Sequence, residues 1–227
     1  MASVRYDIIS IGTFSRNRLW NETQPLRTPH ATTTLIRTNQ HRILVDPGLP
    51  PTAVAARLFE RTGLRPEQID TVFLTNFRPA HRAGLAIFQH ARVLIHEFEQ
   101  QAARQHLDAL LAQAPYEDID RKVIEQELQL LDKLQIADDQ LDESVDLFPL
   151  FGYTPGTSGL LLSQPTATIL VAGDAAPTQE HFLAGQILPD ACDIHAAKQS
   201  LQEIYEIADL IVPGHDNLFL NPRSHGI

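Results

Sequence analysis

The sequence predicts an α/β protein made of two β-rich halves with a helical stretch between them. Short β-branched and aliphatic runs alternate with amphipathic stretches, which is typical of sheets covered by helices. Apolar residues form 43% of the 227-residue chain, enough for a well-buried core and too many for a disordered chain. We expect a single domain over residues 1–227, in which two sheets face each other and the helices lie outside.

Nine segments are expected to be strands, because each is short, rich in β-branched or aliphatic residues and bounded by turn-forming residues. Thr32–Arg37 and Ile43–Val45 flank a short polar turn and predict a hairpin, so the sheets are not expected to be purely parallel. The acidic stretch Asp138–Glu143 and the tail after Asn221 are expected to be irregular. The nine expected strands are Tyr6–Ile11, Thr32–Arg37, Ile43–Val45, Thr71–Leu74, Arg92–Ile95, Ser144–Phe148, Gly159–Leu162, Thr168–Val171 and Leu210–Val212.

The helices are predicted from apolar residues that recur at helical spacing. A first helix is expected to be capped by Thr52 and ended by Gly63. Glu97–Leu111 and Ile119–Leu134 are both amphipathic and together predict a helical insert between the two strand-rich halves. Ile194–Ile207 is expected to be another long helix.

Charge and cysteine content restrict the partners and the compartment. The chain has 18 basic and 28 acidic residues, a net charge of −10, which argues against nucleic acid or an anionic membrane as a partner. This balance leaves open an anionic substrate in a locally positive pocket. Cys192 is the single cysteine, so no internal disulfide can form, which fits a reducing compartment. With no secretory signal and no apolar run of about 18 residues, we expect a cytoplasmic protein.

Four predicted strands run into turns that carry an acid or an imidazole. The residues concerned are Asp46, His81, Asp174 and His215. Ligand sites of α/β proteins gather at the carboxyl ends of strands, and two carboxylates with two imidazoles suit a cation such as zinc. A single strand-end Asp is more often a turn former and a lone His more often structural, but four such endings in order favour a site.

The same turns carry a resemblance that covers most of the chain, from about Tyr6 to Leu220. In order, they read Asp46-Pro47-Gly48, Thr75-Asn76-Phe77-Arg78-Pro79-Ala80-His81-Arg82-Ala83-Gly84, Thr154-Pro155-Gly156-Thr157-Ser158-Gly159, Gly173-Asp174 and Pro213-Gly214-His215. This series resembles the motifs of the metallo-β-lactamase superfamily. The resemblance implies the metallo-β-lactamase fold, a four-layer αββα sandwich, here with a helical insert at about residues 97–134.

The departures from the family pattern fall mainly on one metal position. Where the family has the three imidazoles of its first metal, this chain has Asn76, Arg78 and Thr157. These side chains cannot replace three imidazoles, and an arginine places a positive charge where a cation would lie. We therefore expect the first metal position to be empty.

The resemblance leaves three ligands for the second metal, which are His81, the bridging Asp174 and the closing His215. Ala80 replaces the remaining ligand, an aspartate. Three protein ligands plus water is a known catalytic zinc arrangement, and two histidines with one carboxylate also suit iron. One ion, of zinc, iron or manganese, is therefore expected at most, with Asp46 supporting it from behind.

Two functions remain open from the sequence. The first is a hydrolase that cleaves an ester, lactone, thioester or similar bond by metal-activated water, with Asp46 and Asp174 as catalytic residues. The second is a catalytically silent member that binds a small molecule or a protein partner through the old cleft, without metal. In both, Asn76, Arg78, Thr157 and His181 are expected to line the substrate pocket, and an oligomer is possible.

Arg78 also carries a hypothesis of its own. Its guanidinium could pair with Asp46 or Asp174 and so neutralise the buried acids where a metal would bridge them. The alternative for Arg78 is a surface residue on a loop.

Overall fold

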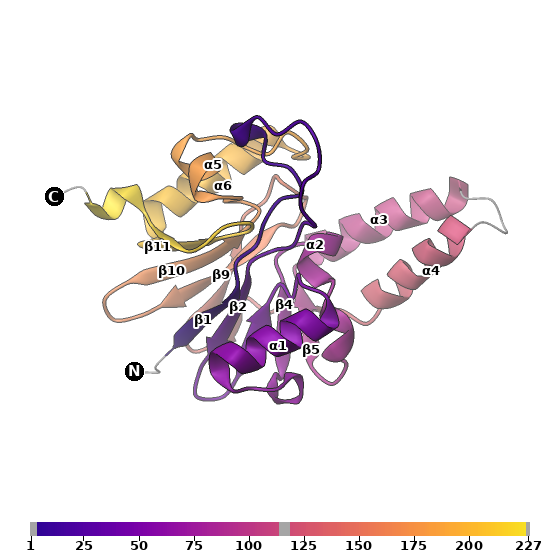
Figure 1. The fold of residues 1–227 in the computed structure, drawn as a ribbon, viewed down its shortest axis with the longest axis horizontal. Helices are drawn as coiled ribbons and strands as arrows, with labels where there is room; N and C mark the ends of the chain where they lie inside the picture. Colours follow the sequence, from indigo (N-terminus) through magenta and orange to yellow (C-terminus); the bar gives the residue numbers. More distant parts are fainter. Residues whose placement is uncertain (1–3, 114–118, 226–227) are drawn as a thin grey trace.

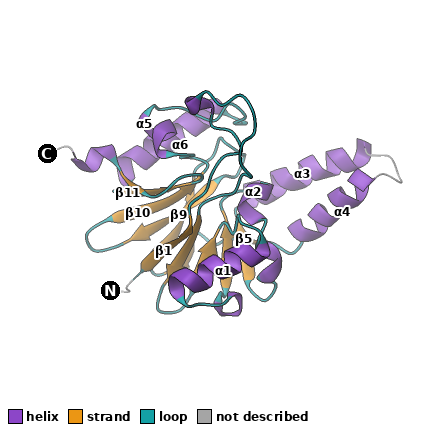
Figure 2. Cartoon of the chain, in the orientation of Figure 1, coloured by secondary structure: helices purple, strands orange, loops and turns teal. Residues whose placement is uncertain are grey.

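Two six-stranded sheets face each other, and helices cover the outer face of each, so the predicted four-layer αββα arrangement is confirmed (Figures 1 and 2). The computed structural model describes residues 4–113 and 119–225. The first half of the chain forms one sheet, and most of the second half forms the other.

The first sheet follows the chain order from β1 to β6. The pairs β1–β2 and β2–β3 are antiparallel, and the pairs from β3 to β6 are parallel, so the predicted hairpin is present in a mixed sheet. Its strands are β1 (Arg5–Ser10), β2 (Thr33–Arg37), β3 (Arg42–Val45), β4 (Thr71–Leu74), β5 (Arg92–Ile95) and β6 (Gln135–Ile136).

The second sheet has the order β12-β11-β10-β9-β8-β7. Among the described strands of this sheet, the β10–β11 pair alone is parallel. The parallel pairs of both sheets matter for function, because parallel neighbours end at the same edge. The strands are β7 (Gln140–Asp142), β8 (Val145–Pro149), β9 (Ser158–Ser163), β10 (Thr168–Gly173), β11 (Leu210–Pro213) and β12 (Phe219–Leu220).

Alternating side chains of the central strands are buried on both faces of each sheet. In β3, Ile43 and Val45 point into the layer between the sheets, whereas Leu44 points to the outer helices. In the second sheet, Leu170 packs towards the outer helices while Ile169 faces the first sheet. This period-two alternation of uniformly apolar residues produces three apolar layers, one between the sheets and one under each set of helices.

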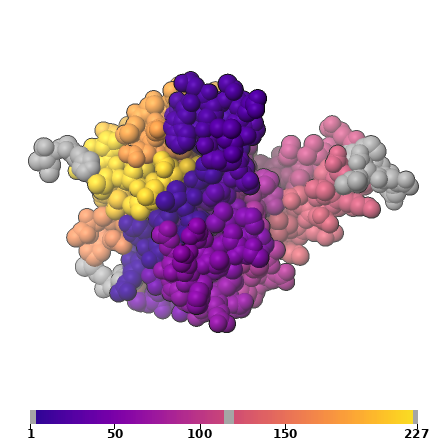
Figure 3. All heavy atoms as spheres, in the orientation of Figure 1, coloured from indigo at the N-terminus to yellow at the C-terminus, as the bar shows by residue number. Residues whose placement is uncertain are grey.

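The helices lie outside the sheets, apart from a hairpin that projects from the body. The hairpin of α3 and α4 stands between β5 and β6 in the chain and extends away from the sandwich (Figures 1 and 3). No helix among the described residues is long and apolar enough to cross a membrane. The helices are α1 (Pro51–Thr62), α2 (Pro79–Arg82), α3 (Glu97–Gln113), α4 (Ile119–Leu131), α5 (Gln179–Leu183) and α6 (Ile194–Ile207), with 3-10 turns at Arg18–Trp20, Pro66–Gln68, Leu85–Ile87 and Pro222–His225.

Several local predictions are corrected. Helix α1 begins at Pro51, with Pro50 as its N-cap, so Thr52 is not the cap; Gly63 does end the helix, with φ of 72°. The stretch expected to be an acidic loop contains β7, and the tail contains a 3-10 turn. Helix α4 stops at Leu131, before the expected end at Leu134. Strands of two or three residues are too short to show a period-two pattern, which is why they were not predicted.

Candidate metal centre

The four strand-end residues lie together at one edge of the sandwich. Asp46 follows β3 and Asp174 follows β10, while His215 follows β11. His81 lies in α2, the short helix after β4. All four are buried, with exposed fractions of 8% or less. The parallel pairs β3–β4 and β10–β11 end at the same edge of their sheets, which brings these side chains together.

His81 lies between two buried carboxylates. Its Nδ1 is 2.9 Å from Oδ2 of Asp46, and its Nε2 is 2.8 Å from Oδ2 of Asp174. Burial alone would lower the pKa of His81, but the charges of Asp174 and Asp46 outweigh it and raise that pKa to about 10. The ring is thus held at both nitrogens by anionic acceptors, in an orientation that leaves little freedom to turn.

His215 is oriented by main-chain carbonyl groups. Its Nδ1 lies 3.0 Å from the carbonyl oxygen of His30 and 3.2 Å from that of Thr13. A carbonyl oxygen can only accept, so the Nδ1 proton is assigned to these bonds. In the neutral ring, Nε2 is then a lone pair, and it lies 3.1 Å from Oδ1 of Asp174. Histidines that bind metals are held in this way through their other ring nitrogen.

Asp174 has one satisfied oxygen and one orphaned oxygen. Oδ1 is buried without a hydrogen-bond partner of acceptable geometry, although Nε2 of His215 is nearby. Gly214 makes room for it, since a Cβ there would lie 2.5 Å from Oδ1. Burial would raise the pKa of Asp174, but His81 and His215 hold that pKa well below its usual value. A buried anionic oxygen that faces imidazole nitrogens is suited to a cation.

These residues fit one metal ion. Ligand atoms of His81, Asp174 and His215 all lie within 4.8 Å of one another. Ligands on a tetrahedral zinc, at bond lengths of about 2.0–2.1 Å, lie about 3.3 Å apart, so the three side chains would move closer together on binding. Two imidazoles and a carboxylate suit zinc or iron, and Asp46 behind His81 provides the usual carboxylate–histidine support.

The residues at the family's first metal position do not fit a second ion. The amide of Asn76 donates to Oδ2 of Asp174 at 3.0 Å. The hydroxyl of Thr157 accepts from the backbone N–H of Thr154 at 2.9 Å. Neither side chain replaces an imidazole, and both are engaged with neighbouring groups.

Arg78 lies away from the buried acids, so the hypothesis that it pairs with Asp46 or Asp174 is wrong. Its Nη1 is 2.9 Å from Oδ2 of Asp190, and its guanidinium lies over the ring of Tyr153 at 4.5 Å. The physical reason is that the side chain of Asn76 already occupies the space beside Asp174, while Asp190 offers Arg78 a solvent-accessible partner. The alternative, a surface residue on a loop, describes Arg78 better.

The Arg78→Ala variant is expected to lose no more than about 1 kcal/mol of unfolding free energy, because exposed ion pairs contribute little. The side chains of Arg78 and Asp190 are 41% and 56% exposed. Urea denaturation checks this, with Arg57→Ala as control, because Arg57 forms a similarly exposed pair with Glu60. A loss of several kcal/mol for Arg78→Ala alone would contradict this view.

A cavity of about 550 Å³ lies beside the buried cluster. Of the four predicted pocket residues, His181 lines it, whereas Asn76, Arg78 and Thr157 are not among its described lining residues. His181 is buried, with Nδ1 2.8 Å from the hydroxyl of Thr178, and burial lowers its pKa. The ring centroid of Phe14 lies 4.3 Å from that of His215 and 5.7 Å from that of His181, so Phe14 stands between the cavity and the cluster.

Sequence reasoning missed Glu99, a buried carboxylate in α3. It accepts from the backbone N–H of Phe77 at 2.8 Å, from that of Gly156 at 3.2 Å and from the hydroxyl of Thr154 at 2.6 Å. Glu99 thus fastens together the two turns that carry Asn76 and Thr157. Nothing in its helical context separates it from the other acidic residues of α3, so no pattern in the sequence pointed to it.

Comparison with known proteins assigns the sequence to a family. The sequence matches the metallo-beta-lactamase superfamily over residues 27–215. A search of curated proteins gives no match.

Three solved structures illustrate the fold likeness. AidC, a dizinc quorum-quenching lactonase in complex with a product, is 16% identical, with a TM-score of 0.66 over 84% of this chain and 74% of that one. The hydrolase AbOPH of the beta-lactamase superfamily is 16% identical, with a TM-score of 0.65 over 97% and 92%. An N-acyl homoserine lactone hydrolase with N-hexanoyl-L-homoserine at its catalytic metal centre is 18% identical, with a TM-score of 0.63 over 94% and 92%. At such identities these structures show likeness of fold alone. The family match spans most of the sequence, and the chain therefore belongs to the metallo-beta-lactamase superfamily.

Proposed function

We propose that this protein is a hydrolase that binds one metal ion at His81, Asp174 and His215 and cleaves an ester, lactone or thioester of a small molecule. One observation carries the proposal: Oδ1 of Asp174 is buried without a hydrogen-bond partner and lies 3.1 Å from Nε2 of His215. A metal ion bound at these two atoms would satisfy the unpartnered carboxylate oxygen and take Nε2 of His215 as a ligand. Zinc, iron and manganese are the ions that we consider.

Bound at this position, a metal ion would supply Lewis acidity and activate water for attack on a carbonyl carbon. The protein groups then have separate tasks. Asp174 would hold the ion through Oδ1, the oxygen that has no hydrogen-bond partner. Asp46 holds the Nδ1 proton of His81 and is a positioning residue. The amide of Asn76 holds Oδ2 of Asp174, so that the carboxylate keeps its direction.

The proposed substrate class rests on the family and on the cavity. Two of the structural neighbours described above are lactonases, and one holds an acyl homoserine product at its metal centre. A cavity of about 550 Å³ is of the usual size for a small organic ligand. Phe14 lines the cavity and also contacts His215, so the cavity lies one ring away from the proposed metal position.

A second candidate function is a silent binding protein, and one observation favours it. Both ring nitrogens of His81 already have carboxylate partners within 2.9 Å, so a protonated His81 would donate to Asp46 and Asp174 and balance one of their two negative charges without a metal. Such a protein would bind a small molecule in the same cavity and hydrolyse nothing.

Hydrolysis assays separate the two candidates. The purified protein is supplied in turn with zinc, iron(II) and manganese, and tested against panels of lactones, aryl esters and thioesters. We expect hydrolytic activity, and we expect Asp174→Asn to lower it by more than about 100-fold. Replacing even a residue that only hydrogen-bonds a metal ligand usually lowers metal affinity or activity by about 10–100-fold. Asp46→Asn is expected to cost about 10–100-fold. The control variant Glu60→Gln, exposed on α1, should keep full activity. Absence of hydrolysis with every ion supports the silent candidate.

A further inference from the structure

The cavity beside the cluster has an apolar wall and a cationic rim. Phe14, Leu19, Ile187 and Leu188 contribute carbon surface, and the ring of Tyr153 adds to it. Arg16 and Arg18 are the arginines among its described lining residues, and Asp190 is the carboxylate. The rim therefore has a defined charge pattern, which a ligand must match.

The negative charge of this rim is already compensated, and the positive charge is not. Asp190 is paired with Arg78 at 2.9 Å. Across residues 4–113 and 119–225, neither Arg16 nor Arg18 has a carboxylate within ion-pair distance. The guanidinium of Arg16 donates to the carbonyl oxygen of Thr23 at 3.1 Å. In a chain of net charge −10, two such cations at one cavity form a local positive site.

The backbone directs both arginines to the same side. Asn17 stands between them in extended conformation, with φ of −97° and ψ of 109°, and residues two apart in an extended segment share a face. Asn17 itself is buried at 4% exposure, and its Oδ1 accepts from the backbone N–H of Leu19 at 2.9 Å. Asn17 thus anchors the segment, and its neighbours on either side line the cavity.

A second contact holds this segment against the C-terminal half. The indole N–H of Trp20 donates to Oε2 of Glu180 at 2.7 Å, which ties the 3-10 turn to α5. The segment before β2, in indigo, lies against the orange and yellow C-terminal half in Figures 1 and 3. The two arginines are therefore presented by a held segment and not by a free loop.

We propose that the cavity selects small molecules with an apolar body and an anionic end group, a carboxylate or a phosphate, which Arg16 and Arg18 bind. The guanidinium fork matches the paired oxygens of both groups. The proposal rests on the proposed function for the reaction that follows binding: with the anionic end on the arginines, the apolar body lies along Phe14 towards His215. The substrate would then differ from a neutral acyl lactone by its free acidic group.

Calorimetric titration of the protein, as purified and after dialysis against a chelator, tests this without any hydrolysis. Octanoate, octyl phosphate and 1-octanol serve as probes, because they share the apolar chain and differ in the end group. We expect one or both anions to bind at least about tenfold more tightly than 1-octanol, as charge-assisted bonds do. The Arg16→Gln/Arg18→Gln variant should bind the anions no better than 1-octanol, with its affinity for 1-octanol unchanged.

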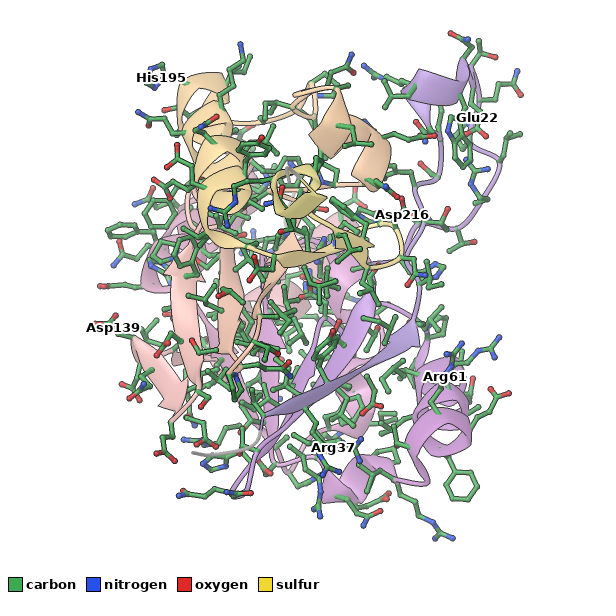
Figure 4. All side chains as sticks on the ribbon, turned by 90° about the vertical axis from the view of Figure 1, so that its left-hand side faces the viewer. Glu22, Arg37, Arg61, Asp139, His195 and Asp216 are labelled. Carbon is green, nitrogen blue, oxygen red and sulfur yellow. The ribbon has the colours of Figure 1, made fainter. Side chains whose placement is uncertain are left out.

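Arg61→Gln is the matched control, since Arg61 projects from α1, well below the loop of Glu22 in Figure 4. It should keep the full preference for anions. The proposal is overturned if 1-octanol binds as tightly as both anions, or if the double variant keeps the preference. Anion binding in a protein that hydrolyses nothing would leave this proposal standing and defeat the hydrolase. Hydrolysis of neutral esters with no preference for anions would do the reverse.

Discussion

Replacing Asp46 with alanine is expected to lower the free energy of unfolding by about 3–5 kcal/mol, the usual cost of removing one partner from a buried ion pair. Asp46 Oδ2 holds Nδ1 of His81 at 2.9 Å, and both groups are almost completely buried. Its carboxylate also accepts from the backbone N–H and the hydroxyl of Thr75, at 2.9 and 2.7 Å. The alanine variant leaves all of these buried donors without their carboxylate acceptor.

Urea denaturation in the presence of a chelator measures this loss without a contribution from metal. Asp46→Asn keeps one oxygen acceptor and nearly the same shape, so its loss should be smaller than that of Asp46→Ala. The control is Asp190→Ala, which removes a carboxylate from an exposed pair with Arg78 and should cost no more than about 1 kcal/mol. Similar losses for Asp46→Ala and Asp190→Ala would show that the buried network does not stabilise the fold.

Gly156→Ala is expected to cost about 3 kcal/mol or more, above the usual range for overpacking, because the new atom meets backbone. A Cβ at Gly156 would lie 2.0 Å from N and 2.5 Å from Cα of Glu99. A flexible side chain could move away, but the first turn of α3 cannot move without breaking the bonds of Glu99 to Phe77 and Thr154. The variant must therefore separate the helix from the turn.

Gly63→Ala is the matched control, because the same atom is added where nothing lies within 4 Å. Its φ of 72° makes the alanine strained by roughly 1–2 kcal/mol, the usual cost of the left-handed region. Thermal and urea unfolding of both variants give the comparison. A Gly156→Ala variant as stable as Gly63→Ala would mean that α3 is not held against the turn as described.

Much of the fold could be predicted because the strands are short, apolar and regularly bounded. Thr71–Leu74 is buried along its whole length and Arg92–Ile95 at its last two residues, so apolar residues dominate both segments, and their bounds were predicted to the residue. The convergence of Asp46, His81 and Asp174 was also predictable, because parallel neighbours end at one edge of a sheet.

Long-range side-chain pairing was not predictable in the same way. The spacing of Arg78 from the motif residues placed it in the loop of the site. It gave no indication that Asp190, 112 residues later, would be its partner. The role of Glu99 was missed for the same reason, because the three groups that donate to its carboxylate come from two turns distant in the sequence. The orientation of His215 depends on the carbonyl oxygen of His30, a main-chain group that carries no sequence signature.

The central claim is that three ligands hold one cation, and the metal content of the untagged protein tests it most directly. Elemental analysis by mass spectrometry, after gel filtration in metal-free buffer, should give about one zinc, iron or manganese ion per chain, bound through the three ligands of a catalytic-type site. His215→Ala and Asp174→Asn should abolish this content, while the control Arg78→Ala should keep it. Two ions per chain, no ion after growth with added metals, or one ion that survives His215→Ala would contradict the account.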